Sequence, residues 1–149
     1  MLSIMNAKQV KEVLANLKER FGFEGKLDYV FLLSNKERLY VVNPEVASVP
    51  LEKLRINTLG MYFGEWKRNE ARMSIEGSQL IGPQCTKNVL ELDDAQTKEW
   101  LKGYDVPYVY ADRGYLLVKH GPDFLGCARA LDDKLQNFVP KNRRVKANA

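Results

Sequence analysis

The sequence contains few residues that could bind a metal or form disulfide bonds. Among 149 residues there are two cysteines, Cys85 and Cys127, and one histidine, His120. Zinc fingers and disulfide-stabilised scaffolds need more ligands or thiols than this, so both classes are excluded. We therefore expect no metal and no cofactor, while the redox state of the two thiols stays open.

Long hydrophobic segments are also absent. No apolar run approaches the roughly 18 residues that a membrane-spanning helix needs, and the longest candidate, residues 29–33, has the length of a strand. The N-terminus lacks the basic segment and the long apolar segment of a secretory signal. These absences predict a cytoplasmic protein with no membrane partner.

Motifs of common enzyme classes do not occur. There is no Gly-x-Gly-x-x-Gly loop, no Walker-type loop and no Gly-x-Ser-x-Gly elbow. His120 lies in a Gly-Pro turn, where a hydrogen-bonding role is favoured over that of a general base. Cys127 lies in an apolar strand and is best explained as a small buried residue. The sequence thus predicts that the chain is not an enzyme, and a cysteine-dependent enzyme using Cys85 or Cys127 is kept as an alternative.

Positive charge is concentrated at the carboxyl end. The formal net charge is +4, from 23 basic and 19 acidic residues. From residue 134 onward there are five basic residues and no acidic one, so the other 133 residues carry a net charge of −1. The five are Lys134, Lys141, Arg143, Arg144 and Lys146. Such a stretch is typical of a surface that binds a polyanion, although a solvated tail that aids solubility explains it equally well.

The N-terminal part predicts one helix and a small sheet. Apolar residues at spacings of three and four predict a helix over residues 6–21, with Asn6 and Gln9 in capping-box positions. Two strands follow at 27–33 and 38–42, joined by a hairpin loop. Residues 44–54 hold short helical pieces at best, and another strand is expected within 56–66. The polar segment Lys67–Glu70 is the predicted domain junction.

The sequence pattern after residue 70 predicts a small barrel. Asp93 and Gln96 again fit a capping box, before a helix at about residues 95–102. Short runs separated by glycine and proline turns are typical of strands in a barrel or pseudobarrel. The expected strands are 72–76, 88–92, 108–111, 115–119, 124–131 and 135–139, and residues 77–82 form an apolar patch bounded by glycines.

Two stretches in this second half resemble a known RNA-binding domain. The first is MSIEGSQLIG at 73–82, followed by NVLELD at 88–93 and EWLKG at 99–103; the second is GPDFLG at 121–126, followed by NFVPKNRR at 137–144. Together they are similar to the PUA-like domain that closes the Sun/Fmu family of RNA cytosine methyltransferases, over about residues 70–146. More loosely, RLYVV at 38–42 and LGMYFG at 59–64 resemble the pre-PUA half of large-ribosomal-subunit biogenesis factors.

This resemblance implies an α+β fold and a function. Residues 1–69 would form an α/β pre-PUA-like domain, and residues 70–149 a PUA-like β pseudobarrel with a basic tail. The partner would be structured RNA, rRNA or tRNA, in RNA maturation or ribosome biogenesis. The glycine-rich S-adenosylmethionine loop and the catalytic cysteine motif of the methyltransferases do not occur in this sequence. Noncatalytic RNA binding is therefore expected.

Basic residues are the candidates for RNA contact. Lysine and arginine neutralise phosphates and release counterions, and arginine can also bind bidentately or stack on bases. The candidates are Arg72, Arg113, Lys119 and Arg129 in the barrel and Lys141, Arg143, Arg144 and Lys146 in the tail. Aromatic candidates for stacking on unpaired bases are Tyr108, Tyr110, Tyr115 and Phe138, although most aromatics of a small barrel lie in its core.

A protein-interaction subunit is the alternative function. Such a subunit would dock an RNA-modifying enzyme of the methyltransferase type or a ribosome assembly factor. The aromatic segment 60–66 would be its contact patch, with core packing as the competing explanation. RNA-independent co-purification of a partner would support this alternative.

Overall fold

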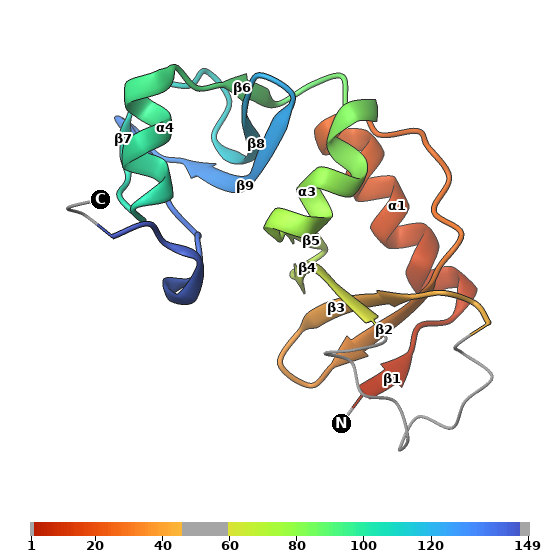
Figure 1. Ribbon diagram of the computed structural model, residues 1–149. Helices are drawn as coiled ribbons and strands as arrows, with labels where there is room; N and C mark the ends of the chain where they lie inside the picture. Colours follow the sequence, from red (N-terminus) through yellow and green to blue (C-terminus); the bar gives the residue numbers. More distant parts are fainter. Residues whose placement is uncertain (1, 46–59, 147–149) are drawn as a thin grey trace.

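The computed structural model describes residues 2–45 and 60–146. Within these ranges the chain forms two five-stranded sheets and three α-helices (Figure 1). The helical pieces expected over 44–54 lie almost entirely outside the described residues. None of the described helices is long and apolar enough to cross a membrane.

The first sheet and its helix comprise the N-terminal half. The elements are β1 (Leu2–Ile4), α1 (Ala7–Phe21), β2 (Val30–Ser34), β3 (Arg38–Val42), β4 (Gly60–Lys67) and β5 (Glu70–Met73). The strands follow one another in chain order, and every pair is antiparallel. The expected helix is confirmed with its capping box, and Gly22 ends it in the left-handed conformation with φ of 66°. That conformation favours glycine because other side chains are strained in it.

The segment expected as a domain junction is a hairpin turn. Lys67 pairs with Glu70 and Trp66 with Ala71, so β4 and β5 belong to the same sheet. Arg68 and Asn69 adopt φ of 54° and 60°, as a two-residue turn between antiparallel strands requires. The sequence interpretation was wrong here because a short polar segment is equally typical of a linker and of a tight turn. A boundary after residue 69 would divide this hairpin.

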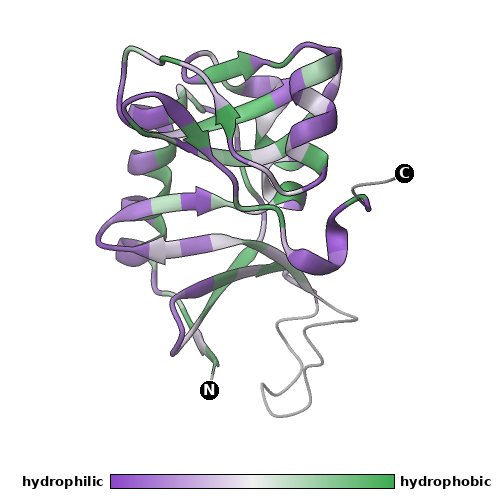
Figure 2. Cartoon of the chain, turned by 90° about the vertical axis from the view of Figure 1, so that its left-hand side faces the viewer, coloured by the Kyte–Doolittle hydropathy of each residue, from purple (hydrophilic) through white to green (hydrophobic). Residues whose placement is uncertain are grey.

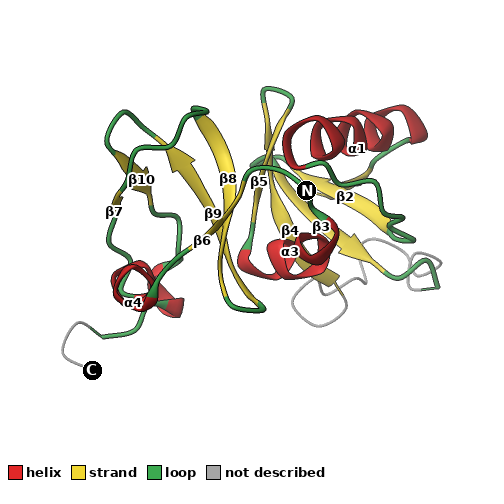
Figure 3. Ribbon diagram, turned by 90° about the horizontal axis from the view of Figure 1, so that it is seen from above, coloured by secondary structure: helices red, strands yellow, loops and turns green. Residues whose placement is uncertain are grey.

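The second sheet forms the C-terminal half. Its elements are α3 (Ile75–Ile81), η3 (Gly82–Gln84), β6 (Val89–Glu91), α4 (Asp94–Leu101), β7 (Val106–Pro107), β8 (Gly114–His120), β9 (Asp123–Ala130), β10 (Lys134–Gln136) and η4 (Lys141–Arg143). The order is β6-β8-β9-β10-β7, with β6 and β8 parallel and the other pairs antiparallel. Seen from above, this sheet curls into a half-barrel with α4 at one end (Figure 3). The expected α+β class is confirmed, and the half-barrel is consistent with a PUA-like pseudobarrel.

Two local predictions in this half were wrong. The apolar residues Leu80 and Ile81 lie in helix α3, which Ser74 caps by accepting a hydrogen bond from Gly77 N at 2.9 Å. The expected strand 72–76 ends at Met73 because of this cap. Residues 108–111 are not a strand; the strand in this region is β7, which pairs with β10. Intrinsic propensity misled both predictions, because tertiary packing overrides it.

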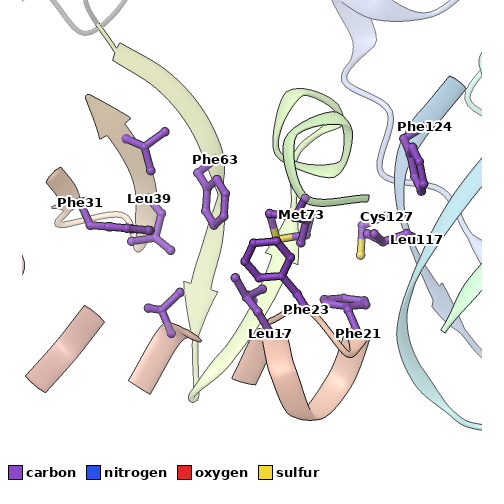
Figure 4. Packing of buried hydrophobic residues seen from close by; sticks show 14 of the residues in the cluster. Leu17, Phe21, Phe23, Phe31, Leu39, Phe63, Met73, Leu117, Phe124 and Cys127 are labelled. Atoms are coloured by element: carbon purple, nitrogen blue, oxygen red, sulfur yellow. The ribbon is translucent and has the colours of Figure 1, made fainter. Parts of the chain in front are cut away.

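The two sheets share a hydrophobic core. Phe21, Phe31 and Phe63 of the first half lie in one buried cluster with Leu117, Phe124 and Cys127 of the second half. Figure 4 shows Phe21 on the side of α1 that faces β8 and β9. A second cluster, around the fully buried Trp100, lies inside the half-barrel. Because the first cluster draws on both sheets, we expect the two halves to unfold together.

Helix α3 lies against β4 at a contact that only glycine permits. A Cβ added at Gly77 would lie 2.1 Å from Phe63 O and 2.8 Å from Met73 Cε. At an open helical site, Gly→Ala would stabilise the protein by about 1 kcal/mol. At Gly77 the clash reverses the sign, so Gly77→Ala should lower the free energy of unfolding by about 1–3 kcal/mol. Urea denaturation tests this, and a gain in stability would contradict the close packing.

Candidate nucleic-acid interface

A cleft of about 640 Å³ lies between the first sheet and the C-terminal segment. One wall comes from β3, β4 and β5, the other from residues 138–143, and α3 and β9 contribute between them. The polar and aromatic lining residues are Arg38, Tyr40, Tyr62, Glu65, Arg72, Ser74, Glu76, Trp100, Phe138, Asn142 and Arg143. A hollow of this size can hold a small molecule or a single unit of a polymer.

The sheet wall of the cleft follows from strand alternation. Leu39 and Val41 of β3 are buried in the core that α1 covers, so Arg38 and Tyr40 lie on the opposite face. Tyr40 pairs with Tyr62 across the strands, and the ring centroids are 5.6 Å apart. A row of charges lies beside the tyrosines, because Glu65 is paired in register with both Arg38 and Arg72.

The polar side chains of this wall are partly buried, which favours an ion pair and shifts the pKa of a tyrosine. Arg72 Nη2 and Glu65 Oε2 are 3.0 Å apart, and both side chains are about a quarter exposed, at 22% and 28%. Burial raises the pKa of Tyr62, with Arg72 acting in the opposite direction. The Tyr62 hydroxyl therefore stays protonated at neutral pH and can donate a hydrogen bond.

Two arginines flank a pair of aromatic rings in a row that begins at the edge of the cleft. Arg72 Cζ lies 4.4 Å from the centroid of the Phe138 ring. Phe138 contacts the Tyr115 ring edge-on at 6.2 Å, and Arg129 Cζ lies 5.5 Å from the Tyr115 centroid. We call these four residues the arginine–aromatic ladder. The structure thus brings together two predicted arginines and two predicted aromatics in cation–π contacts.

The basic tail is attached to the body as far as residue 145. Val145 N donates to Leu101 O at 2.8 Å, and Arg144 Nε donates to Val139 O at 2.9 Å. Arg143 forms an ion pair with Glu76 of α3. Figure 2 shows this segment as a hydrophilic turn beside the body of the molecule. These contacts favour a fixed basic surface over a freely solvated tail.

The predicted basic residues lie in three places: at the cleft, on the tail and away from both. Arg72 and Arg143 line the cleft, Arg129 extends from it along the ladder, and Lys141, Arg144 and Lys146 are exposed on the tail. Arg113 pairs with Asp132 at 3.2 Å, and Lys119 lies over the Phe124 ring at 5.3 Å; neither lines the cleft. Lys134, counted in the basic tail, is paired with Asp105 at 3.3 Å.

Sequence reasoning missed the sheet wall of the cleft. Arg38, Tyr40 and Tyr62 were not among the candidate residues. The period-two alternation of residues 38–42 could have placed Arg38 and Tyr40 on one face. Nothing in the sequence indicates that this face lies opposite the C-terminal segment. Of the predicted aromatics, Tyr108 and Tyr110 pack against the second core cluster instead.

The two cysteine thiols are shielded by burial, and the His120 imidazole is held by hydrogen bonds. Burial raises the pKa of Cys85 to about 11 and that of Cys127 to about 12, so both thiols stay protonated at neutral pH. Cys127 is buried, as expected. His120 Nδ1 lies 2.9 Å from Leu92 O and Nε2 lies 3.0 Å from Asp94 Oδ1. The Leu92 hydrogen bond and then Asp94 raise the pKa of His120. The expected hydrogen-bonding role is confirmed, although His120 is the last residue of β8 and not part of the turn.

Comparisons with known proteins point to RNA methyltransferases. A family model described as the Methyltransferase RsmF PUA domain matches residues 87–145. Ribosomal RNA small subunit methyltransferase F of Shewanella sp. (strain MR-4) is 27% identical over 145 residues, which cover 92% of this chain and 30% of the relative. The protein of the same name from Vibrio cholerae serotype O1 (strain M66-2) is 25% identical over 136 residues, covering 90% and 28%. The one from Shewanella baltica (strain OS223) is 35% identical over 77 residues, covering 50% and 15%.

These matches extend the resemblance found in the sequence. The family model lies within the expected region 70–146. The full-length alignments cover about nine-tenths of the chain, so they include most of its N-terminal half as well. The chain spans less than a third of the length of these relatives. It carries a PUA-like domain related to that of the Sun/Fmu family of RNA methyltransferases.

Proposed function

We propose that this chain binds RNA in the modification or maturation of rRNA and that it does not itself catalyse a reaction. The observation that carries the proposal is the arginine–aromatic ladder beside the cleft, with Arg72 and Arg129 held over aromatic rings. Arginine recognises phosphate bidentately, and aromatic rings stack on unpaired bases, so the combination is typical of RNA-binding surfaces. The relatives are named as methyltransferases of small-subunit ribosomal RNA, which makes that rRNA the first candidate.

The docking alternative has less support. The segment proposed as its contact patch is β4, which lies between β3 and β5 in the sheet. Phe63 is fully buried, and Met61 and Trp66 pack against the first core cluster. The aromatic side chains of this segment are therefore mostly used in packing. Roles in tRNA maturation or as a partner of a modifying enzyme, and a pre-PUA arrangement of the N-terminal half, remain predictions.

Binding to RNA is expected to weaken steeply with salt. Lys134 is paired with Asp105, which leaves Lys141, Arg143, Arg144 and Lys146. If these four cations contact phosphates of single strands, the plot of log affinity against log salt should have a slope of roughly −2.8, at about 0.7 per phosphate. Fluorescence anisotropy with a labelled fragment of small-subunit rRNA, from roughly 50 to 200 mM salt, measures this slope. A tRNA transcript and a DNA of the same sequence serve as comparisons. Failure to bind any RNA at low ionic strength would overturn the proposed function.

A further inference from the structure

We propose that the cleft between the first sheet and the C-terminal segment holds one unpaired nucleotide of the bound RNA, with its base against Tyr40 and Tyr62. This inference rests on the proposed function and makes it more specific. It assigns RNA contact to both halves of the chain rather than to the half-barrel alone. The cleft would then select single-stranded or looped RNA over uniform duplex.

The size of the cleft suits one nucleotide. Its volume of about 640 Å³ falls in the range of pockets that hold small molecules. A base inside a duplex is stacked on both sides, so it cannot reach a ring inside a cleft without leaving the helix. An unpaired base in a loop or at an end is already free to do so.

Tyr40 and Tyr62 supply a stacking surface that the fold has left open. Both side chains are half-buried, and they are presented by adjacent strands at the cleft wall. Of the two other aromatic residues that line the cleft, Phe138 is already covered on one face by Arg72, and Trp100 is fully buried. The tyrosine pair is therefore the surface on which a base can stack, and the apolar residues Met73, Ile75 and Leu125 also line the cleft.

The arginines of the cleft suit a phosphate, but carboxylates in the same cleft partly neutralise them. Arg38, Arg72 and Arg143 line it, and two carboxylates, Glu65 and Glu76, line it as well. Glu76 is paired with Arg143, whose side chain is 45% exposed. A phosphate entering beside Arg143 must displace or share with this carboxylate. Glu76 thus competes with the nucleotide for Arg143.

The competition predicts effects of opposite sign at the two ends of one ion pair. Arg143→Gln should weaken binding of a single-stranded RNA oligonucleotide about three- to tenfold, because a phosphate contact is lost. Glu76→Gln should tighten binding by a similar factor, because Arg143 is released and a negative charge near the phosphate is removed. Glu76 and Arg143 are both at the surface, so neither change should unfold the protein.

The tyrosines are tested with a fluorescent base. An RNA oligonucleotide with a single 2-aminopurine in an unpaired position should bind with quenched fluorescence, and its perfectly paired duplex should bind at least tenfold more weakly. Replacing both tyrosines by leucine should reduce affinity about tenfold or more and restore the fluorescence. The double Tyr→Phe variant loses only the two hydroxyls and keeps both rings, so it should still quench the fluorescence and should bind more tightly than the leucine variant. Tyr29→Leu, at an exposed tyrosine outside this cleft, is the matched control.

The outcomes separate the two proposals. If no RNA of any form binds, the proposed function fails. If RNA binds but duplex and single strand bind equally, or if the leucine variant still quenches 2-aminopurine, the nucleotide site is wrong while the function stands. Weaker binding by Glu76→Gln would contradict the assigned competition. Thermal denaturation of each variant shows whether a loss of binding comes from unfolding.

Discussion

Replacing Lys141, Arg143 and Lys146 together by glutamate is expected to weaken RNA binding by about 100-fold at low salt. Three charge-assisted phosphate contacts at about 1 kcal/mol each amount to ~3 kcal/mol, and every 1.4 kcal/mol is roughly tenfold in Kd. The salt slope should fall by about 2, at roughly 0.7 per phosphate on single strands. All three residues are exposed, so the fold should be kept.

The control for this variant must change the net charge equally. Lys8, Lys11 and Lys26 are exposed on α1 and the loop that follows it, and none of them lines the cleft. Replacing these three by glutamate should leave the slope nearly unchanged. Arg144 is left intact in both variants because its hydrogen bond to Val139 O attaches the tail. Equal losses in the two variants would show that only overall charge matters.

Phe21→Ala is expected to destabilise both halves of the chain by about 3–5 kcal/mol. Phe21 is fully buried in the cluster that draws on both sheets. Truncation removes the burial of a ring and leaves a cavity where the sheets meet. Since small domains are stable by only about 5–15 kcal/mol, the loss should lower the denaturation midpoint markedly.

The two tryptophans allow each half to be followed separately. Trp66 is on β4 in the first sheet, and Trp100 is on α4 in the second core cluster. With either tryptophan replaced by phenylalanine, the remaining one reports unfolding of its own half. The shared core predicts coincident urea transitions in both backgrounds, shifted together by Phe21→Ala. Two separate midpoints, or a shift of only the Trp66 transition, would show that the halves are independent. Val109→Ala, at a side chain 78% exposed, should change stability by less than about 0.5 kcal/mol.

Short sequence patterns correctly predicted the helices that are stabilised by residues close together in the chain. Helices α1 and α4 were identified from their capping boxes and, for α1, from its apolar periodicity, because these interactions span only three or four residues. Helix α3 was missed because Gly77 and Gly82 lower helix propensity. A Cβ at either position would meet Phe63 or Phe124, so packing requires the glycines that propensity penalises.

The sequence by itself determined the α+β class, the PUA-like second half and the concentration of positive charge at the carboxyl end. Each depends on composition, on short-range spacing or on motifs that can be read along the chain. Only the tertiary structure decided that Tyr40 and Tyr62 lie opposite Arg143 and that Arg72 stacks on Phe138. Both arrangements bring together residues at least 66 positions apart in the sequence, which is the separation of Arg72 and Phe138. Such pairs arise from how two sheets pack on a shared core, which no local pattern records.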